Sequence, residues 1–183
     1  MKKSLVAGVA LMIVAAACSV SGEINIGSSP VENQVEDFVE GDFGDGFGLG
    51  DLDASCTKPS STDVGTTFLC TATTTTGDVV RLEATLAEDD FFDVQTTNLI
   101  LGESWGPIEG EMVRILSENT ADGAAAITVD CGKETRIFDI GVSEPHICAA
   151  SDGSGSVFDL SIAFTSLVPG NILWDWEIGD IRP

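Results

Sequence analysis

Apolar residues recur at helical spacing in two segments that each begin with a proline. Four of them follow each proline at the same offsets: Val31, Val35, Phe38 and Val39 after Pro30, and Ile108, Met112, Ile115 and Leu116 after Pro107. Spacing of i, i+4, i+7 and i+8 places such side chains on one face of an α-helix. The pattern therefore predicts amphipathic helices over Pro30–Glu40 and Pro107–Glu118, with Ser29 as the N-cap of the first.

Period-two alternation after each helix predicts strands. In the first half we expect them near Leu52–Cys56, Thr66–Ala72, Val79–Leu86 and Phe91–Thr97, and in the second half near Ala125–Cys131, Arg136–Ile140, Val157–Phe164 and Ile172–Ile178. Glycines at 77 and 155 precede the third strand of each set, which indicates a hairpin turn. A helix followed by a run of strands is typical of an α+β fold, with the helix on one face of an antiparallel sheet.

The two halves share one layout, which indicates a duplication. The first cysteine comes 26 positions after Pro30 and 24 after Pro107, and the second cysteine comes 14 and 17 positions later. Beyond the second cysteine the halves align without a gap. We therefore predict two tandem related modules, residues 29–98 and 99–183, each one helix packed on a small antiparallel sheet with one internal disulfide.

Four cysteines of the two modules allow three pairings. Duplication selects Cys56–Cys70 and Cys131–Cys148, because each module then keeps its own pair. Such a bridge stabilises a small module by about 3 kcal/mol in the chain-entropy model. The cysteines lack a Cys-x-x-Cys spacing, so we predict structural disulfides and no metal site.

The N-terminus has the features of an export signal, and we assign residues 1–17 to a signal peptide. Lys2 and Lys3 precede an apolar run of 13 residues, Leu5–Ala17, which is too short to span a membrane. Small residues then lead directly to Cys18, an arrangement that resembles the lipobox of bacterial lipoproteins, although Ala15-x-Ala17 also suits ordinary signal peptidase. A lipidated Cys18 accounts for the odd fifth cysteine, and residues 18–28 are expected to be a tether. The expected location is the extracytoplasmic face of the cell membrane.

The net charge of the mature chain limits the classes of molecule that it can bind. Once Lys2 and Lys3 are removed with the leader, six basic residues face thirty acidic ones, a net charge of −24. Such a surface repels phosphate backbones and anionic head groups, which excludes nucleic acid and peripheral membrane binding. Three glutamates of the first helix, Glu32, Glu36 and Glu40, repeat every four residues, a spacing at which like charges repel.

Several residue groups offer chemistry, and each has a simpler structural interpretation. The Gly/Asp-rich stretch 41–53 has calcium-ligand types but no calcium-loop spacing, which favours a solvated loop. His146 is the single histidine and lacks a nucleophile motif, so we expect it at a strand border. The acidic run 88–90 carries little information about carboxylate-based catalysis in so acidic a chain. Trp105, Trp174 and Trp176 are expected in core packing. We predict no catalytic residue, no metal and no cofactor.

The first module also carries a longer motif. It comprises Cys56-Thr57-Lys58-Pro59, then Val64-Gly65-Thr66-Thr67-Phe68-Leu69-Cys70-Thr71-Ala72, then Gly77, Val79 and Leu82. This segment resembles a domain of unknown function found in secreted and lipid-anchored actinobacterial proteins. The resemblance implies a small helix-plus-sheet unit without known catalytic residues. The second module departs from it, with Ser143 in place of Gly65 and His146 in place of Phe68.

The functional expectation is a non-enzymatic cell-envelope lipoprotein that presents two small modules for binding or sensing. Its partners would be the membrane, through the lipid on Cys18, and an envelope protein or a small ligand. One alternative is a carrier of an apolar ligand held between helix and sheet, which requires an internal cavity of ~300 Å³ or more. The other is a hydrolase, which requires two carboxylates that converge in a cleft.

Overall fold

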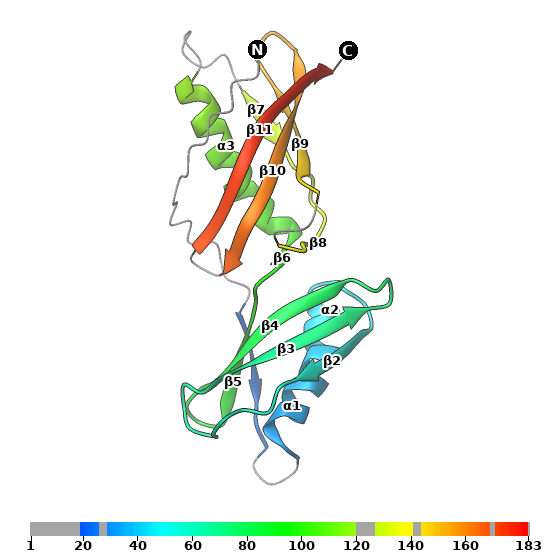
Figure 1. Ribbon diagram of the computed structural model, residues 1–183, viewed down its shortest axis with the longest axis vertical. Coiled ribbons are helices and arrows are strands. Elements are labelled where there is room, and N and C mark those ends of the chain that lie inside the picture. Colours follow the sequence, from blue (N-terminus) through cyan, green and yellow to red (C-terminus); the bar gives the residue numbers. More distant parts are fainter. Residues whose placement is uncertain (1–18, 26–28, 120–126, 141–143, 169–170, 183) are drawn as a thin grey trace.

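Each predicted helix packs on one face of an antiparallel sheet, and the two helix-plus-sheet units lie one above the other along the long axis of the molecule (Figure 1). The computed structural model describes residues 19–25, 29–119, 127–140, 144–168 and 171–182. The leader expected at 1–17 and Cys18 lie outside these residues. Among the helices that the structure describes, none combines the length and the apolar character that crossing a membrane requires.

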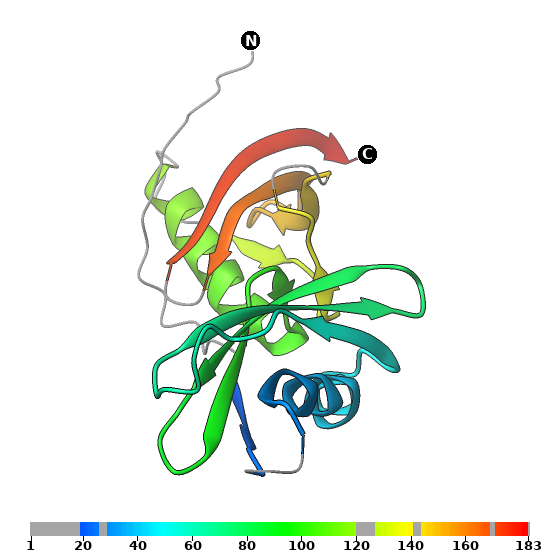
Figure 2. The same ribbon diagram turned by 60° about the horizontal axis from the view of Figure 1, so that its bottom comes forward.

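The first module has one helical segment and five strands. The helical segment comprises α1 (Val31–Phe38), a π-helical turn η1 (Val39–Phe43) and α2 (Gly44–Gly46). The sheet has the order β1-β5-β4-β3-β2, with β1 at Ser19–Glu23, β2 at Leu52–Cys56, β3 at Thr67–Thr74, β4 at Val79–Leu86 and β5 at Phe91–Thr96. Figure 2 shows the helical segment against one face of this twisted sheet. Alternate residues of the strands are buried on that face because side chains alternate across a strand.

The second module repeats this architecture. A 3-10 turn, η2 (Gly102–Ser104), leads into α3 (Trp105–Asn119). The sheet has the order β11-β10-β9-β7, with β7 at Thr128–Asp130, β9 at His146–Ser151, β10 at Val157–Val168 and β11 at Asn171–Arg182. Within the described parts of the chain, both modules thus have one helical segment followed by a four-stranded antiparallel sheet, and β1 is an addition to the first.

Strand registers agree with a duplication. Cys70 lies opposite Leu82 between β3 and β4, and Cys148 lies opposite Leu160 between β9 and β10. The predicted turn glycines at 77 and 155 have φ of 91° and 89°, a conformation that side-chain-bearing residues rarely adopt. The α+β class and the tandem helix-plus-sheet modules are therefore as predicted.

The prolines, however, do not mark equivalent positions in the two helices. Pro30 is the N-cap of α1 and Ser29 is not, whereas Pro107 lies inside α3, which begins at Trp105. Helix–strand contacts instead match Glu36 with Glu109, because each accepts a hydrogen bond from the first cysteine of its own module. The buried residues then pair as Val35 with Ile108, Val39 with Met112 and Phe43 with Leu116. The alignment on prolines is therefore wrong by one helical turn.

Two segments expected to be irregular are ordered elements. Residues 41–46 of the Gly/Asp stretch continue the helix, because Phe43 is fully buried and anchors the π turn against the sheet. Ser19–Glu23, expected within the tether, forms strand β1 and pairs with β5. Strand β9 was not predicted either, although the alignment of the two halves places it at the position equivalent to β3.

A two-stranded ladder joins the modules. It consists of β6 (Leu99–Ile100) and β8 (Arg136–Ile137), so the strand predicted at Arg136–Ile140 pairs with the linker and not with the main sheet. Leu99 and Ile137 contribute to the first core, while Ile100 and the following Phe138 contribute to the second. Alternate residues of one short ladder therefore pack into both cores.

Candidate functional site

Both predicted disulfides are present and occupy matching places. Cys56 at the end of β2 is bonded to Cys70 of β3, directly opposite in the register. Cys131, which follows β7, is bonded to Cys148 of β9. Each disulfide joins the outermost strand to its neighbour beneath the helix.

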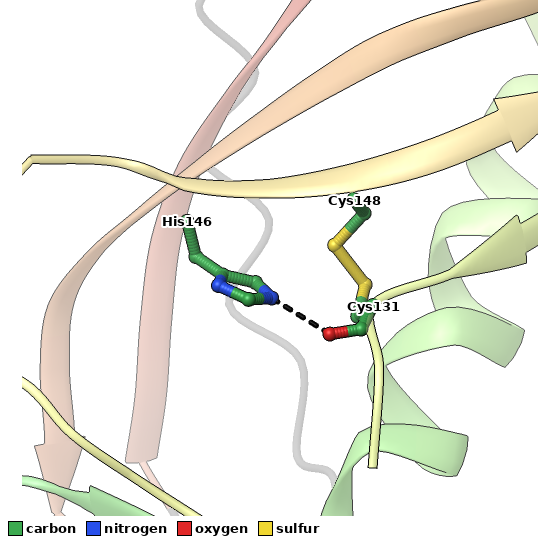
Figure 3. A group of neighbouring side chains, drawn as sticks. All are labelled: Cys131, His146 and Cys148. Atoms are coloured by element: carbon green, nitrogen blue, oxygen red, sulfur yellow. Dashed lines mark hydrogen bonds between the residues drawn. A yellow bond between two sulfur atoms is a disulfide. The ribbon is translucent and has the colours of Figure 1, made fainter. Parts of the chain in front are cut away.

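His146 lies beside the second disulfide, at the first position of β9. Its ring stacks on Trp105 with centroids 4.4 Å apart and meets Phe138 edge-on at 6.2 Å. Its Nε2 lies 2.8 Å from the carbonyl oxygen of Cys131, as Figure 3 shows. Because a carbonyl oxygen can only accept, Nε2 carries a proton and donates it.

Burial lowers the pKa of His146 below its ordinary value. The hydrogen bond to Cys131 opposes this effect, and the positive charge of Arg136 adds to it. The side chain is therefore neutral at neutral pH and is part of the second core. It occupies the place that Phe68 has in the first module, since Phe68 lies opposite Ala84 as His146 lies opposite Ile162.

The three tryptophans contribute to packing in the second module. Trp105 is 1% exposed and donates from Nε1 to the carbonyl oxygen of Glu134 at 2.9 Å. Trp174 and Trp176 share one face of β11 and are half-buried against the second core. They do not form an exposed platform for a ligand.

The acidic runs lie at the surface. Residues 88–90 lie in the turn between β4 and β5, where Asp89 and Asp90 have φ of 58° and 61°. In the Gly/Asp stretch, Asp42, Asp45, Asp51 and Asp53 are exposed. Within the described ranges, one group of three or more metal-ligating side chains lies within reach of a single ion, and it is Cys131, His146 and Cys148.

A cleft of about 540 Å³ lies in the first module between β1, the helical segment and the start of β5. Its walls consist of Ser21, Gly22, Glu23, Gln34, Asp37, Phe38, Gly41, Asp42, Phe91 and Phe92. Phe38 and Phe92 meet edge to face with centroids 5.3 Å apart, and Phe91 is 42% exposed. Gly22 lies opposite Phe92, where a Cβ would overlap the ring, so glycine allows β1 to cross this aromatic floor.

The charge of the cleft is one-sided. Glu23, Asp37 and Asp42 line it, and no lysine or arginine is among its described lining residues. Among the residues that the structure describes, none of these three carboxylates forms an ion pair. Asp42 belongs to the π turn, a feature that recurs at functional sites. The cleft combines the half-buried ring of Phe38 with the exposed carboxylates of Asp37 and Asp42, a pairing that suits an organic cation.

The sequence alone did not indicate this cleft. It depends on β1, whose five residues were assigned to a tether, and on the π turn within a stretch expected to be a loop. One usable signal was present: Val39, Phe43 and Phe47 recur every four residues, so the apolar face continues past Glu40. Searches with this chain against family models, curated proteins and solved structures find no match.

Proposed function

We propose that this protein is a non-enzymatic lipoprotein of the cell envelope, anchored through Cys18, whose first module binds a cationic group in the cleft between β1 and α1. The observation that carries the proposal is that Asp37 and Asp42 line the cleft together with Phe38, with no lysine or arginine among the described lining residues. The bound group would belong to an envelope protein or to a small ligand.

The residues that line the cleft determine the expected strength and salt dependence of binding. A cation over an aromatic ring is worth about 0.5–2 kcal/mol, depending on how far it is desolvated. Exposed carboxylates add an electrostatic attraction, which decays over a Debye length of about 8–10 Å at physiological salt. Binding should therefore be weak for a single cationic group and should decline as salt is added.

A matched pair of probes tests the site. Choline and 3,3-dimethylbutan-1-ol have nearly the same shape, and only choline is charged. We expect choline to shift the amide NMR signals of β1, α1 and η1, and the neutral alcohol to leave them in place. The double variant Asp37→Asn/Asp42→Asn should lose about 3- to 10-fold in choline affinity. Asp45→Asn/Asp51→Asn, with exposed carboxylates outside the cleft, is the control.

The outcomes separate the hypotheses. Equal binding of the alcohol would favour the apolar carrier. No shift with either probe would contradict a cation site. In cells, crosslinking of the tagged protein followed by mass spectrometry should identify partners that Asp37→Asn/Asp42→Asn loses, and the membrane-fraction product should carry an acylated Cys18. A water-soluble product without acyl mass would contradict the lipid anchor.

A hydrolase is the second candidate, because Glu23, Asp37 and Asp42 line one cleft and glycoside hydrolysis uses a pair of carboxylates. It predicts turnover of a glycoside substrate. Release of nitrophenol from a panel of aryl glycosides by the wild type, and not by Asp37→Asn, would decide in its favour over simple binding.

A further inference from the structure

The second module brings two sulfurs and an imidazole together under its helix. The donor atoms of Cys131, His146 and Cys148 all lie within 4.8 Å of one another, and the residues are 5%, 7% and 0% exposed. His146 and Cys148 are two apart on β9 and share its inner face, while Cys131 directly follows the neighbouring strand β7 (Figure 3).

We propose that the reduced second module binds one Zn²⁺ ion through Cys131, His146 and Cys148. Two thiolates and one imidazole are a zinc-binding set that leaves a fourth position for water. Bonds of about 2.3 Å to sulfur and about 2.0 Å to nitrogen hold donor atoms ~3.5 Å apart in a tetrahedron. The side chains therefore need to move by about 1 Å or less once the disulfide is opened.

The site and the disulfide exclude each other. A dithiol reductant gives two electrons and two protons to the bond between the two Sγ atoms and itself becomes a disulfide. Zinc then displaces both thiol protons to water, because only thiolates are good ligands. His146 stays neutral and binds through the ring nitrogen that has no proton; binding through Nε2 moves its proton to Nδ1 and ends the hydrogen bond to Cys131. In the reverse step a disulfide oxidant takes two electrons from the two thiolates and two protons from water and becomes a dithiol, while the Cys131–Cys148 bond re-forms and the ion is released. The second module thus alternates between a covalent bridge and a metal bridge across the same two strands.

The first module is a built-in comparison. Its Cys56–Cys70 disulfide joins the equivalent strands, but Phe68 stands where His146 does, so the third ligand is missing. Both positions are buried. The reduced chain should therefore hold one tightly bound ion and not two. This inference is independent of the cleft in the first module.

Metal titration of the reduced mature chain, in a Cys18→Ser background, tests the proposal. The chain is reduced with a phosphine, freed of it under argon and titrated with Co²⁺ and then with Zn²⁺. We expect one equivalent of Co²⁺ with thiolate charge-transfer and tetrahedral bands, which Zn²⁺ displaces. The oxidised chain should show none. His146→Phe, which copies the first module, should lower the zinc affinity at least about 10-fold.

A reciprocal variant keeps the result interpretable. Phe68→His in the His146→Phe background should restore one equivalent, now in the first module. If the reduced chain loses its fold, Zn²⁺ should restore the near-ultraviolet circular dichroism of the His146-containing protein and not that of His146→Phe. Equal zinc affinity of wild type and His146→Phe would overturn the proposal, as would refolding by zinc that does not require His146.

Discussion

The carboxylate of Glu36 accepts a hydrogen bond from the backbone N–H of Cys56 at 2.7 Å, and this contact ties the helix to an edge of the sheet. Strand β2 is the outer strand, so its N–H groups have no further strand to pair with. Glu40 accepts a hydrogen bond from the N–H of Ala54 in β2 at 2.9 Å, and Glu109 accepts one from the N–H of Cys131, directly after the outer strand β7 of the second module, at 2.8 Å. Helix glutamates thus cover strand edges that would otherwise invite pairing with another chain.

Removing this contact should cost stability. Glu36→Ala leaves the N–H of Cys56 without its acceptor, and we expect a loss of about 1–3 kcal/mol in the free energy of unfolding. Glu109→Ala should do the same in the second module. Denaturant unfolding measures both. Glu32→Gln is the control on the same helix and should stay within about 0.5 kcal/mol; an equal effect of Glu32→Gln would contradict the role of the edge contact.

The free energy of unfolding should decrease as the pH is lowered, because His146 then takes up a proton more readily in the unfolded chain. Unfolded histidine has a pKa of about 6.5, and burial lowers the pKa in the folded state, so the unfolded chain takes up the proton first. The contribution is fully present above about pH 6.5 and is lost as pH falls through the folded pKa, with a slope of at most about 1.4 kcal/mol per pH unit.

Urea unfolding between pH 8 and pH 5 measures this dependence. Replacement of His146 by Phe removes the titrating group while keeping an aromatic ring against Trp105 and Phe138. The variant should lack the slope just below pH 6.5 and keep the carboxylate titration at lower pH. An unchanged slope in His146→Phe would show that another group is responsible.

Asn98 should be the critical polar residue of the junction. It is 2% exposed, its Oδ1 accepts from the N–H of Arg81 at 2.7 Å, and its Nδ2 donates to the carbonyl oxygens of Val79 and Phe138 at 2.8 and 3.1 Å. Asn98→Ala leaves three backbone groups unpaired, and we expect a loss of about 2–3 kcal/mol or more.

The matched control at the junction is Arg81→Gln. The ion pair of Arg81 with Asp139 has an N–O distance of 3.0 Å and joins side chains that are 50% and 58% exposed, so its removal should cost less than about 1 kcal/mol. Hydrogen exchange of β6 and β8 should increase in Asn98→Ala and change little in Arg81→Gln. A larger increase in hydrogen exchange in Arg81→Gln than in Asn98→Ala would show that the ion pair, and not Asn98, couples the modules.

Gly22 should be required for the docking of β1. A methyl group at this position would overlap the ring of Phe92, which is 1% exposed and cannot move aside without cost. We expect Gly22→Ala to destabilise the protein by about 1–3 kcal/mol and to raise hydrogen exchange in β1. Gly41→Ala is the control, because a Cβ there has no neighbour within 4 Å. Retained protection of β1 in Gly22→Ala would refute the packing argument.

Sequence repeats and cysteine spacing were sufficient to predict the modules, since period-two alternation and a duplicated pair of cysteines are local signals. Strands β2 and β4 begin and end where the alternation places them. The alignment of the two helices could not be predicted from such local signals. Two prolines look equivalent in the sequence, but Trp105 starts its helix two residues earlier because its ring has a place against His146 and Phe138.

Everything that gathers residues from distant segments was decided by tertiary packing. Ser19–Glu23 is a strand because β5 offers it an edge, and five residues carry too little pattern to show that by themselves. The cleft therefore appears only once β1 lies beside the helix. His146 and Cys131 are 15 residues apart, and only the pairing of β7 with β9 brings the two sulfurs and the imidazole into one group. Local periodicity determines which elements form, whereas contacts between elements determine which side chains meet.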